Sequence, residues 1–404
     1  MRRRAVAVVL GIVVLGTSAA CGGPEDPATK RSPRSPSATT SPAATSNPPA
    51  PPSPTSSGSR PTTTVTPSPS PSRREDPRAI RPAVSSTVTT GLTSPWDVAV
   101  LPDGSALVSE RDTGRIVRVT TSGTARTIGR VPGVDHGGEG GLLGLALSPR
   151  YPTDHLMYAY ITTSGDNRVV TMTYDEGRLG RPRVVLDGIP RGDLHHNGGR
   201  IRFGPDGFLY VSTGDGGVPS RAQDKESLAG KILRITTTGR PASGNPFGNE
   251  VWTYGHRNVE GLAFDDEGRL WASEFGDKGA DELNLIRRGG NYGWPHLEGR
   301  GGTDQGFVDP VATWDIEQSS PAGIAYRNGA IWMAALRGQR LWRVRLDGTE
   351  VVARPTDFLV EKYGRLRTVE AMPDGSLWLV TNNTDGRIGP RPGDDRILRL
   401  TLRR

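Results

Sequence analysis

A unit that recurs six times between residues 96 and 404 constrains the fold of this chain more than any other feature. Each copy has an apolar stretch, a tight turn such as Pro-Asp-Gly, a second apolar stretch and then a third strand. Glycine in the turn supplies the positive φ that a hairpin needs, and the flanking β-branched and aromatic residues favour strands. Clear copies begin at Trp96, Gly198, Gly261 and Thr368, and looser copies begin at Gly141 and Ala322.

A spacing of roughly 50 residues per copy is typical of propeller blades. The repeat therefore predicts an all-β, six-bladed β-propeller over residues 83–404. No stretch has the 3.6-residue periodicity of an amphipathic helix, so we expect few helices. A ring of blades must also be closed, and residues 87–90 (TVTT) are the predicted outer strand of the last blade.

The N-terminus is typical of an exported protein. Arg2, Arg3 and Arg4 precede an apolar run that is too short to cross a bilayer, so residues 1–20 are a predicted signal peptide. Cys21, the only cysteine, follows small residues, and this junction resembles a bacterial lipoprotein site at which the thiol is lipidated. Secretion with an incidental cysteine is the alternative. A single cysteine excludes an intramolecular disulfide.

Residues 21–82 consist mostly of Pro, Ser, Thr, Ala and Gly, a composition that predicts a disordered tether before the propeller. The formal net charge is +7, but lysines and arginines are interspersed with acidic residues. This distribution indicates no nucleic-acid partner. We expect contact with a membrane only through the lipid anchor.

Four segments carry residues that the blade pattern does not require. The first, LHHNGGR, places His195 and His196 before paired glycines at the start of a strand. Asp215 follows the next strand, and a hairpin would return it towards His196. A nearby carboxylate fixes the tautomer of an imidazole and raises its basicity. His196 is therefore a candidate base. Two ordinary loop histidines would give the same sequence pattern.

The second segment, GHRN, places Arg257 beside Asn258, a pair that suits a planar anionic or carbonyl-bearing ligand. An arginine that bridges two blades would look the same. The third segment, EFGDKGADE followed by NYGWP, combines carboxylates with glycine-exposed carbonyls. Calcium prefers such oxygen ligands, although acidic, glycine-rich turns are often only solvated.

The fourth segment is a set of arginines, with Arg337 in ALRG and Arg365 and Arg367 in GRLRTV. Alternate residues of a strand point the same way, so Arg365 and Arg367 project two guanidinium groups to one side. Because two such charges repel unless an anion lies between them, the arginines favour a polyanionic ligand. The four segments together predict one pocket with a base, several arginines and an oxygen-ligated cation.

With these motifs, the chain resembles the soluble sugar dehydrogenases that use pyrroloquinoline quinone (PQQ), the glucose, aldose and sorbosone dehydrogenase family. The resemblance extends over the whole propeller through GGEGGLLGLALSP, HHNGGRIRFGPDG, STGDGG, LAGKILRI, GHRNVEGLAF and GRLRTV, in that order. It implies oxidation of an aldose at its anomeric carbon to a lactone, with hydride transfer to calcium-bound PQQ. An electron acceptor that the sequence does not identify would then reoxidise the cofactor.

The resemblance also implies roles for individual residues. His196 would be the general base, supported by Asp215, and Arg257 and Asn258 would hold the cofactor and polarise its reactive carbonyl. The cofactor carboxylates would be clamped by Arg337, Arg365 and Arg367.

The main-chain carbonyls of Gly276 and Asp277 would bind the calcium that bridges to the cofactor. Glu282 and the carbonyl of Tyr292 fall at the spacing of a further calcium site.

Some positions depart from the family pattern. Glu139 and Glu260 occupy positions at which the family usually has glutamine. By its position, Glu139 would contact the cofactor. A carboxylate that faces an anionic cofactor is repulsive unless it is protonated, metal-bound or turned away. Arg337 replaces a lysine of the glucose-oxidising branch, as in the broader aldose branch. Trp314 is a candidate platform for stacking a sugar.

Two other functions fit a six-bladed propeller. A calcium-dependent hydrolase of the lactonase type would place its metal on side chains that line the central channel, and it would need no cluster of arginines. A non-catalytic binding propeller would keep the pocket without turnover.

Overall fold

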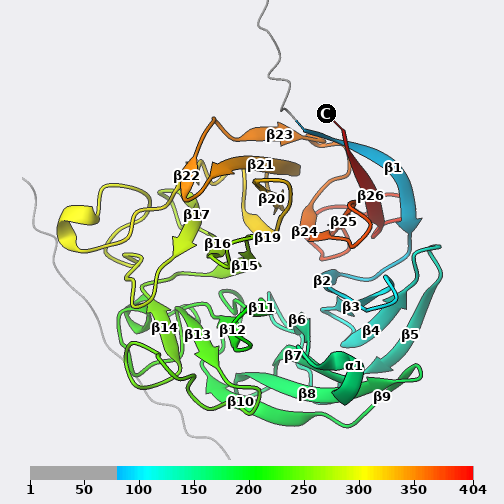
Figure 1. Ribbon diagram of the computed structural model, residues 1–404, viewed down its shortest axis with the longest axis horizontal. Helices are drawn as coiled ribbons and strands as arrows, with labels where there is room; N and C mark the ends of the chain where they lie inside the picture. Colours follow the sequence, from blue (N-terminus) through cyan, green and yellow to red (C-terminus); the bar gives the residue numbers. More distant parts are fainter. Residues whose placement is uncertain (1–79, 404) are drawn as a thin grey trace, which may run out of the picture. The chain divides into compact units, whose positions relative to one another are not determined.

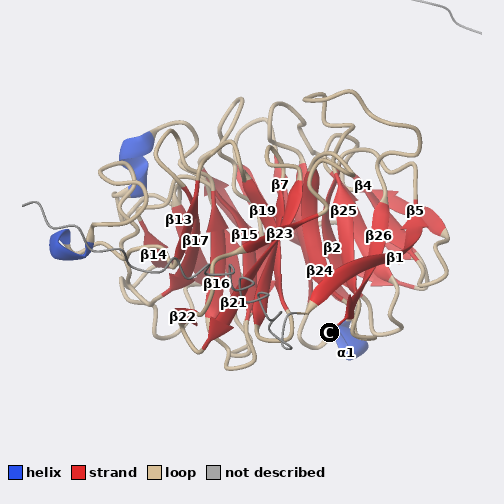
Figure 2. Ribbon diagram, turned by 90° about the horizontal axis from the view of Figure 1, so that it is seen from above, coloured by secondary structure: helices blue, strands red, loops and turns tan. Residues whose placement is uncertain are grey.

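The computed structural model describes residues 80–403, which form the predicted six-bladed propeller (Figure 1). The predicted signal peptide, Cys21 and the predicted tether up to residue 79 lie outside the described residues. No helix within residues 80–403 is long and apolar enough to span a membrane. The strands run between two faces of loops (Figure 2).

The six blades are antiparallel sheets that follow one another along the chain (Figure 1). In blades 1 to 5 the first strand along the chain lies nearest the axis, whereas the outermost strand of blade 6 is the N-terminal one. Blade 1 comprises β2 (Pro95–Val100), β3 (Ala106–Glu110), β4 (Arg115–Val119) and β5 (Ala125–Arg130). Blade 2 comprises β6 (Leu142–Leu147), β7 (Leu156–Thr162), β8 (Asn167–Asp175), β9 (Arg178–Leu179) and β10 (Arg183–Ile189). Blade 3 comprises β11 (Ile201–Phe203), β12 (Leu209–Ser212), β13 (Lys231–Ile235) and β14 (Val251–Tyr254).

The second half of the ring repeats this order. Blade 4 comprises β15 (Val259–Phe264), β16 (Leu270–Glu274), β17 (Asp281–Ile286) and β18 (Ala312–Trp314). Blade 5 comprises β19 (Pro321–Tyr326), β20 (Ala330–Ala335), β21 (Arg340–Asp347), β22 (Glu350–Val351) and β23 (Thr356–Phe358). Blade 6 comprises β24 (Leu366–Ala371), β25 (Leu377–Thr381), β26 (Ile397–Arg403) and β1 (Arg81–Thr89).

The two looser copies of the repeat are the two blades that carry a fifth strand, blades 2 and 5. As expected, the described part of the chain has few helices, and they are short. They are α1 (Tyr151–Asp154) and the 3₁₀ turns η1 (Pro219–Ala222) and η2 (Thr303–Gln305).

The ring is closed as predicted, because β1 pairs antiparallel with β26 and so joins the N-terminal strand to the last blade. Thr87 lies opposite Leu398 in this pairing. The strand begins at Arg81, two residues before the predicted start of the propeller. Closure removes the unpaired strand edge that an open ring would leave between blades 6 and 1.

The Pro-Asp-Gly segments form the tight hairpin turns that the sequence predicts. In the turn of blade 1, Gly104 has a φ of +78°, and the Asp103 carboxylate accepts the backbone N–H of Ser105 at 2.9 Å. In blade 6, Gly375 has a φ of +88°, and Asp374 accepts the N–H of Ser376 at 2.9 Å. Aspartate and glycine thus fix the hairpins that set the register of each blade.

The core consists of buried clusters between neighbouring blades rather than one central cluster. The cluster between blades 6 and 1, for example, contains Val98, Val108, Trp378 and Val380. A blade is apolar on both faces, so each face is buried against the next blade around the ring.

Trp314 belongs to the cluster between blades 4 and 5, and the prediction that it stacks a sugar is wrong. Its side chain lies beside Trp342, with ring centroids 5.7 Å apart, and only 7% of the residue is exposed.

Buried and half-buried charged residues form ion pairs among the inner strands of the ring. Asp97 on β2 pairs with Arg200 and with Arg202, whose Nη1 lies 2.8 Å from its Oδ2. Arg202 also pairs with Glu370 on β24 at 3.1 Å. The guanidinium of Arg200 lies 4.1 Å from the centre of the Trp96 ring. These ion pairs connect three blades without leaving an uncompensated buried charge.

Candidate active site

A cavity of about 630 Å³ lies on one face of the ring, where the ends of the inner strands and the loops beside them meet. This volume is within the range of small-molecule sites. His196 lines the cavity together with two glutamates and five arginines. These are Glu139, Glu260, Arg257, Arg337, Arg365, Arg367 and Arg387. The cavity therefore brings together the predicted base and the predicted arginines.

His196 is positioned by a carboxylate, as the hairpin of blade 3 predicts. Its Nδ1 lies 2.7 Å from Oδ1 of Asp215, which is fully buried. The N–H of Gly217 and Nε1 of Trp294 also donate to Asp215, at 2.7 and 2.8 Å. Burial alone would raise the pKa of Asp215, but the hydrogen bond and charge of His196 hold that pKa below its usual range. Asp215 is thus an ionised acceptor for the Nδ1–H of His196, and in the neutral imidazole this tautomer places the lone pair on Nε2.

Arg257 lies on the wall of the cavity, with its guanidinium 5.4 Å from the centre of the Trp294 ring. Its Nη2 is 3.0 Å from Oδ1 of Asp277, whereas its Nε is buried and has no hydrogen-bond partner within the described residues. An unsatisfied guanidinium N–H is costly, so this group fits a ligand acceptor.

Asn258 is fully buried beneath the cavity and is absent from its lining residues. Its Oδ1 accepts the N–H of Gly198 at 2.9 Å, and its Nδ2 donates to Glu260 at 3.1 Å. Asn258 therefore fixes the glycines beside His196 and one carboxylate of the cavity, whereas the resemblance implied direct contact with the cofactor.

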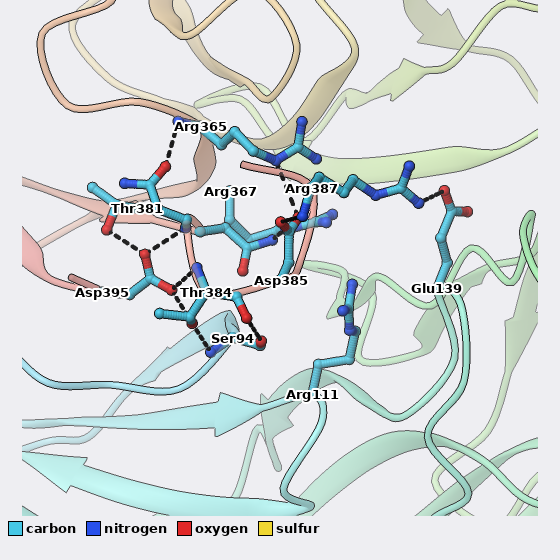
Figure 3. A network of polar contacts seen from close by, with 12 residues as sticks. Ser94, Arg111, Glu139, Arg365, Arg367, Thr381, Thr384, Asp385, Arg387 and Asp395 are labelled. Carbon is cyan, nitrogen blue, oxygen red and sulfur yellow. Dashed lines mark hydrogen bonds and ion pairs between the residues drawn. The ribbon is translucent and has the colours of Figure 1, made fainter. Parts of the chain in front are cut away.

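Arg365 and Arg367 lie on one side of the cavity with carboxylate partners (Figure 3). Arg367 pairs with Glu260 at 2.8 Å, and Arg365 pairs with Asp385 at 3.1 Å. Burial lowers the pKa of Arg365 to about 10 and lowers the pKa of Arg367 as well, although their carboxylate partners oppose this. Nε of Arg367 is buried and has no hydrogen-bond partner among residues 80–403. A bound anion would compensate the buried positive charges and accept the unused hydrogen bond of Arg367. The arrangement therefore fits a polyanionic ligand.

Two further arginine–glutamate pairs lie at the cavity; the first is exposed, and the second is half-buried because the Glu139 side chain is only 18% exposed. Arg337 pairs with Glu317 at 2.9 Å, and their side chains are 53% and 69% exposed. Arg387 pairs with Glu139 at 3.2 Å, and its side chain is 50% exposed. Exposed pairs such as Arg337–Glu317 contribute about 0–1 kcal/mol, whereas breaking a buried pair such as Arg367–Glu260 costs about 3–5 kcal/mol.

Glu139 has a second contact, because its Oε2 accepts the backbone N–H of His196 at 2.9 Å. Its carboxylate faces the cavity but is paired with Arg387, which the sequence did not single out. Arg387 lies in the loop GRIGPRPG, whose composition indicates only a turn.

A small second cavity of about 10 Å³ lies next to the first, and Arg257 and Phe275 line both. Its wall also contains three of the predicted calcium ligands, Gly276, Glu282 and Tyr292. Asp277 lines neither cavity, and its carboxylate pairs with Arg257.

Glu282 faces a second carboxylate in this small cavity, that of Glu274. Burial and the charge of Glu274 raise the pKa of Glu282 to about 8. Within residues 80–403, no three Asp, Glu, His or Cys side chains form a metal-binding group. A cation here would therefore need main-chain carbonyls in addition to carboxylates, the donor set that calcium accepts.

The fold and the cavity define a six-bladed propeller whose arginine-lined cavity, beside a carboxylate-supported histidine, suits an anionic molecule. The family model of the glucose/sorbosone dehydrogenases matches residues 92–390, and the chain belongs to this family. The chain is 55% identical to an aldose sugar dehydrogenase of Streptomyces coelicolor whose structure was solved in its PQQ-bound form. That match covers 81% of this chain and 99% of the other, with a TM-score of 0.79.

Two curated relatives are more distant. The chain is 28% identical to the aldose sugar dehydrogenase of Escherichia coli, over 74% of this chain and 91% of the relative. It is 34% identical to the quinoprotein glucose dehydrogenase B of Acinetobacter calcoaceticus, over 52% of each chain.

Proposed function

We propose that the protein oxidises an aldose at its anomeric carbon to a lactone, with PQQ as the hydride acceptor and calcium as the supporting ion. The observation that carries the proposal is the His196–Asp215 pair, which faces a cavity lined by five arginines. The PQQ-bound relative from Streptomyces coelicolor supports the identity of the anion.

The chain supplies the base. With Nδ1 held by Asp215 at 2.7 Å, Nε2 of His196 accepts the proton of the anomeric hydroxyl. Asp215 stabilises the imidazolium that forms, and the Trp294 and Gly217 hydrogen bonds keep that carboxylate in place. When bound, PQQ would accept the hydride from the same carbon, which leaves that carbon as the carbonyl of a lactone.

The arginines supply the cofactor site. Arg337, Arg365 and Arg367 would hold the carboxylates of PQQ, and the partner-free Nε of Arg257 would donate to one of its oxygens. Main-chain carbonyls of Gly276 and Asp277 would hold the calcium beside the cofactor, and Glu282 with the carbonyl of Tyr292 would hold a further calcium. Gly276, Glu282 and Tyr292 line the small cavity next to Arg257 and Phe275. Calcium would neutralise the facing carboxylates of Glu274 and Glu282.

The lactonase-type alternative is disfavoured by the charges along the central channel. A catalytic cation there would lie beside Arg200 and Arg202, which already compensate Asp97 and Glu370. The cluster of arginines around the main cavity would also have no role in that reaction.

The test is aldose-dependent reduction of a redox dye by the purified protein, supplied with PQQ and calcium, over a broad panel of sugars. The proposal expects turnover with at least one aldose and a lactone as product. Bound PQQ without turnover would indicate a binding propeller, and lactone hydrolysis without PQQ would indicate a hydrolase.

For localisation, we propose that Cys21 is lipidated after removal of residues 1–20 and anchors the propeller outside the cytoplasmic membrane. Replacing the thiol (Cys21→Ser) should move the protein from the membrane fraction to the culture medium. Equal membrane association of both forms would contradict lipidation at this residue.

A further inference from the structure

The loop between β25 and β26 brings a fifth arginine to the rim of the cavity. Arg387 and Ile388 of this loop line the cavity, and Arg387 pairs with Glu139, 248 positions away in sequence (Figure 3). Glu139 precedes β6, so this ion pair connects blade 6 to the loop between blades 1 and 2.

The loop is fixed at its two ends. At the first end, Asp385 accepts Nε of Arg365 and the backbone N–H of Arg387, each at 3.1 Å. At the other end, Asp395 accepts the hydroxyl of Thr381 at 2.9 Å and the N–H of Thr384 at 3.1 Å. Asp385 therefore places the backbone of Arg387 beside the guanidinium of Arg365.

The Arg387 side chain is held less firmly than the backbone of this loop, which Arg391 also fixes by donating to the main-chain carbonyls of Glu361 and Lys362. Gly386 and Gly393 have φ values of +79° and +81°, and the Arg387 side chain is 50% exposed. The Arg387–Glu139 pair is half-buried, with side chains 50% and 18% exposed, whereas the Arg367–Glu260 pair is buried, with both side chains 5% exposed. A ligand anion in the cavity can therefore replace Glu139 as the partner of Arg387 more readily than it can separate Arg367 from Glu260.

From this geometry we infer that Arg387 is a further cofactor-binding residue, which Glu139 holds at the rim until the anionic cofactor takes over its guanidinium. Arg387 then acts with Arg365, to which Asp385 connects it. Glu139 has two tasks, since its other oxygen accepts the N–H of His196. The inference deepens the proposed function and rests on it.

The test measures the affinity of the purified, cofactor-free protein for PQQ in the presence of calcium, by quenching of tryptophan fluorescence. For Arg387→Gln we expect a dissociation constant raised about tenfold or more, because a charge-assisted contact is lost. The dependence of affinity on salt should also become shallower than in the wild type.

For Glu139→Gln we expect tighter binding, because the competing charge is gone while the amide oxygen can still accept the His196 N–H. The matched control is Arg391→Gln in the same loop, whose guanidinium donates to the main-chain carbonyls of Glu361 and Lys362. Its affinity should equal that of the wild type, and thermal unfolding should show that every variant is folded.

The remaining outcomes distinguish failure of this inference from failure of the proposed function. Equal affinity and salt dependence in the wild type and Arg387→Gln would overturn the inference and leave the proposed function intact. Equal weakening by Arg391→Gln would also overturn it, because the loop rather than the charge would then matter. No PQQ binding by the wild-type protein would instead overturn the proposed function.

Discussion

Nδ1 of His196 and Oδ1 of Asp215 lie 2.7 Å apart, although the two residues are 19 positions apart and belong to different loops of blade 3. The contact forms because β11 and β12 run antiparallel and return the chain to the same face of the ring. The carboxylate thereby settles which imidazole nitrogen faces the cavity, and the first prediction depends on that assignment.

Replacing the base should slow the chemical step and leave cofactor binding nearly unchanged. For His196→Ala we expect kcat to fall by on the order of 10²–10⁴, because general-base catalysis is lost. Asp215→Asn should also lower kcat, since the imidazolium loses its counter-charge. The control is His136→Ala, whose side chain is exposed and does not line the cavity. Dye reduction with saturating PQQ measures the effect, and an unimpaired His196→Ala variant would contradict the assignment.

Binding of PQQ should become weaker as the pH rises, because of Glu260. Burial and the charge of Glu139 raise the pKa of Glu260 above its usual value of 4.5, although Arg367 opposes this. An anionic ligand at Arg367 favours protonated Glu260 further, so binding takes up a proton and the affinity falls as the pH rises through that raised pKa. Glu260→Gln should bind PQQ with a flatter pH profile. Parallel profiles for the two proteins, measured by fluorescence titration, would argue against this role.

Calcium should stabilise the protein through the small cavity beside Arg257. We expect added calcium to raise the unfolding temperature, since it binds only the folded chain, and chelation to release PQQ. Glu282→Gln should reduce the calcium-dependent rise, because the further calcium site loses its carboxylate. The control is Asp304→Asn, an exposed carboxylate in η2. An undiminished response to calcium in Glu282→Gln would place the ion elsewhere.

The ion pairs of the buried Asp97 should contribute strongly to the stability of the inner strands. Asp97→Asn leaves Arg200 and Arg202 with less compensating charge, and we expect the free energy of unfolding to fall by about 3–5 kcal/mol.

The same aspartate has a defined effect on acid stability. Burial would raise the pKa of Asp97, but the two arginines lower it below 3.8. Its contribution is therefore complete above pH 3.8 and is lost as the pH falls through the lowered pKa of the folded state. Urea unfolding at several pH values should show a weaker acid dependence in Asp97→Asn. Asp193→Asn, at a side chain that is 96% exposed, is the control, and a matching loss of stability there would contradict the account.

Local sequence was sufficient to predict the blades, because Asp-Gly turns and alternating apolar residues determine each hairpin before the ring forms. It also predicted that His196, Arg257, Arg365 and Arg367 would share one pocket. The resemblance to a known family provided the ligand that those residues would hold.

Contacts that depend on the closed ring could not be predicted in this way. The Glu139–Arg387 pair connects blade 6 to the loop between blades 1 and 2, and no local pattern in GRIGPRPG indicates it. The prediction for Trp314 was wrong for a related reason. Alternation along a strand does not reveal which side chains a neighbouring blade will cover.

The central claim is that aldose oxidation reduces PQQ bound beside His196. The most direct measurement is the absorbance of PQQ bound to the purified protein, with calcium and without oxygen, after addition of each sugar from a broad aldose panel. The account predicts that one equivalent of a suitable aldose converts the bound cofactor to its reduced spectrum in the wild type, and far more slowly in His196→Ala. A bound cofactor whose spectrum stays unchanged with every aldose would contradict it.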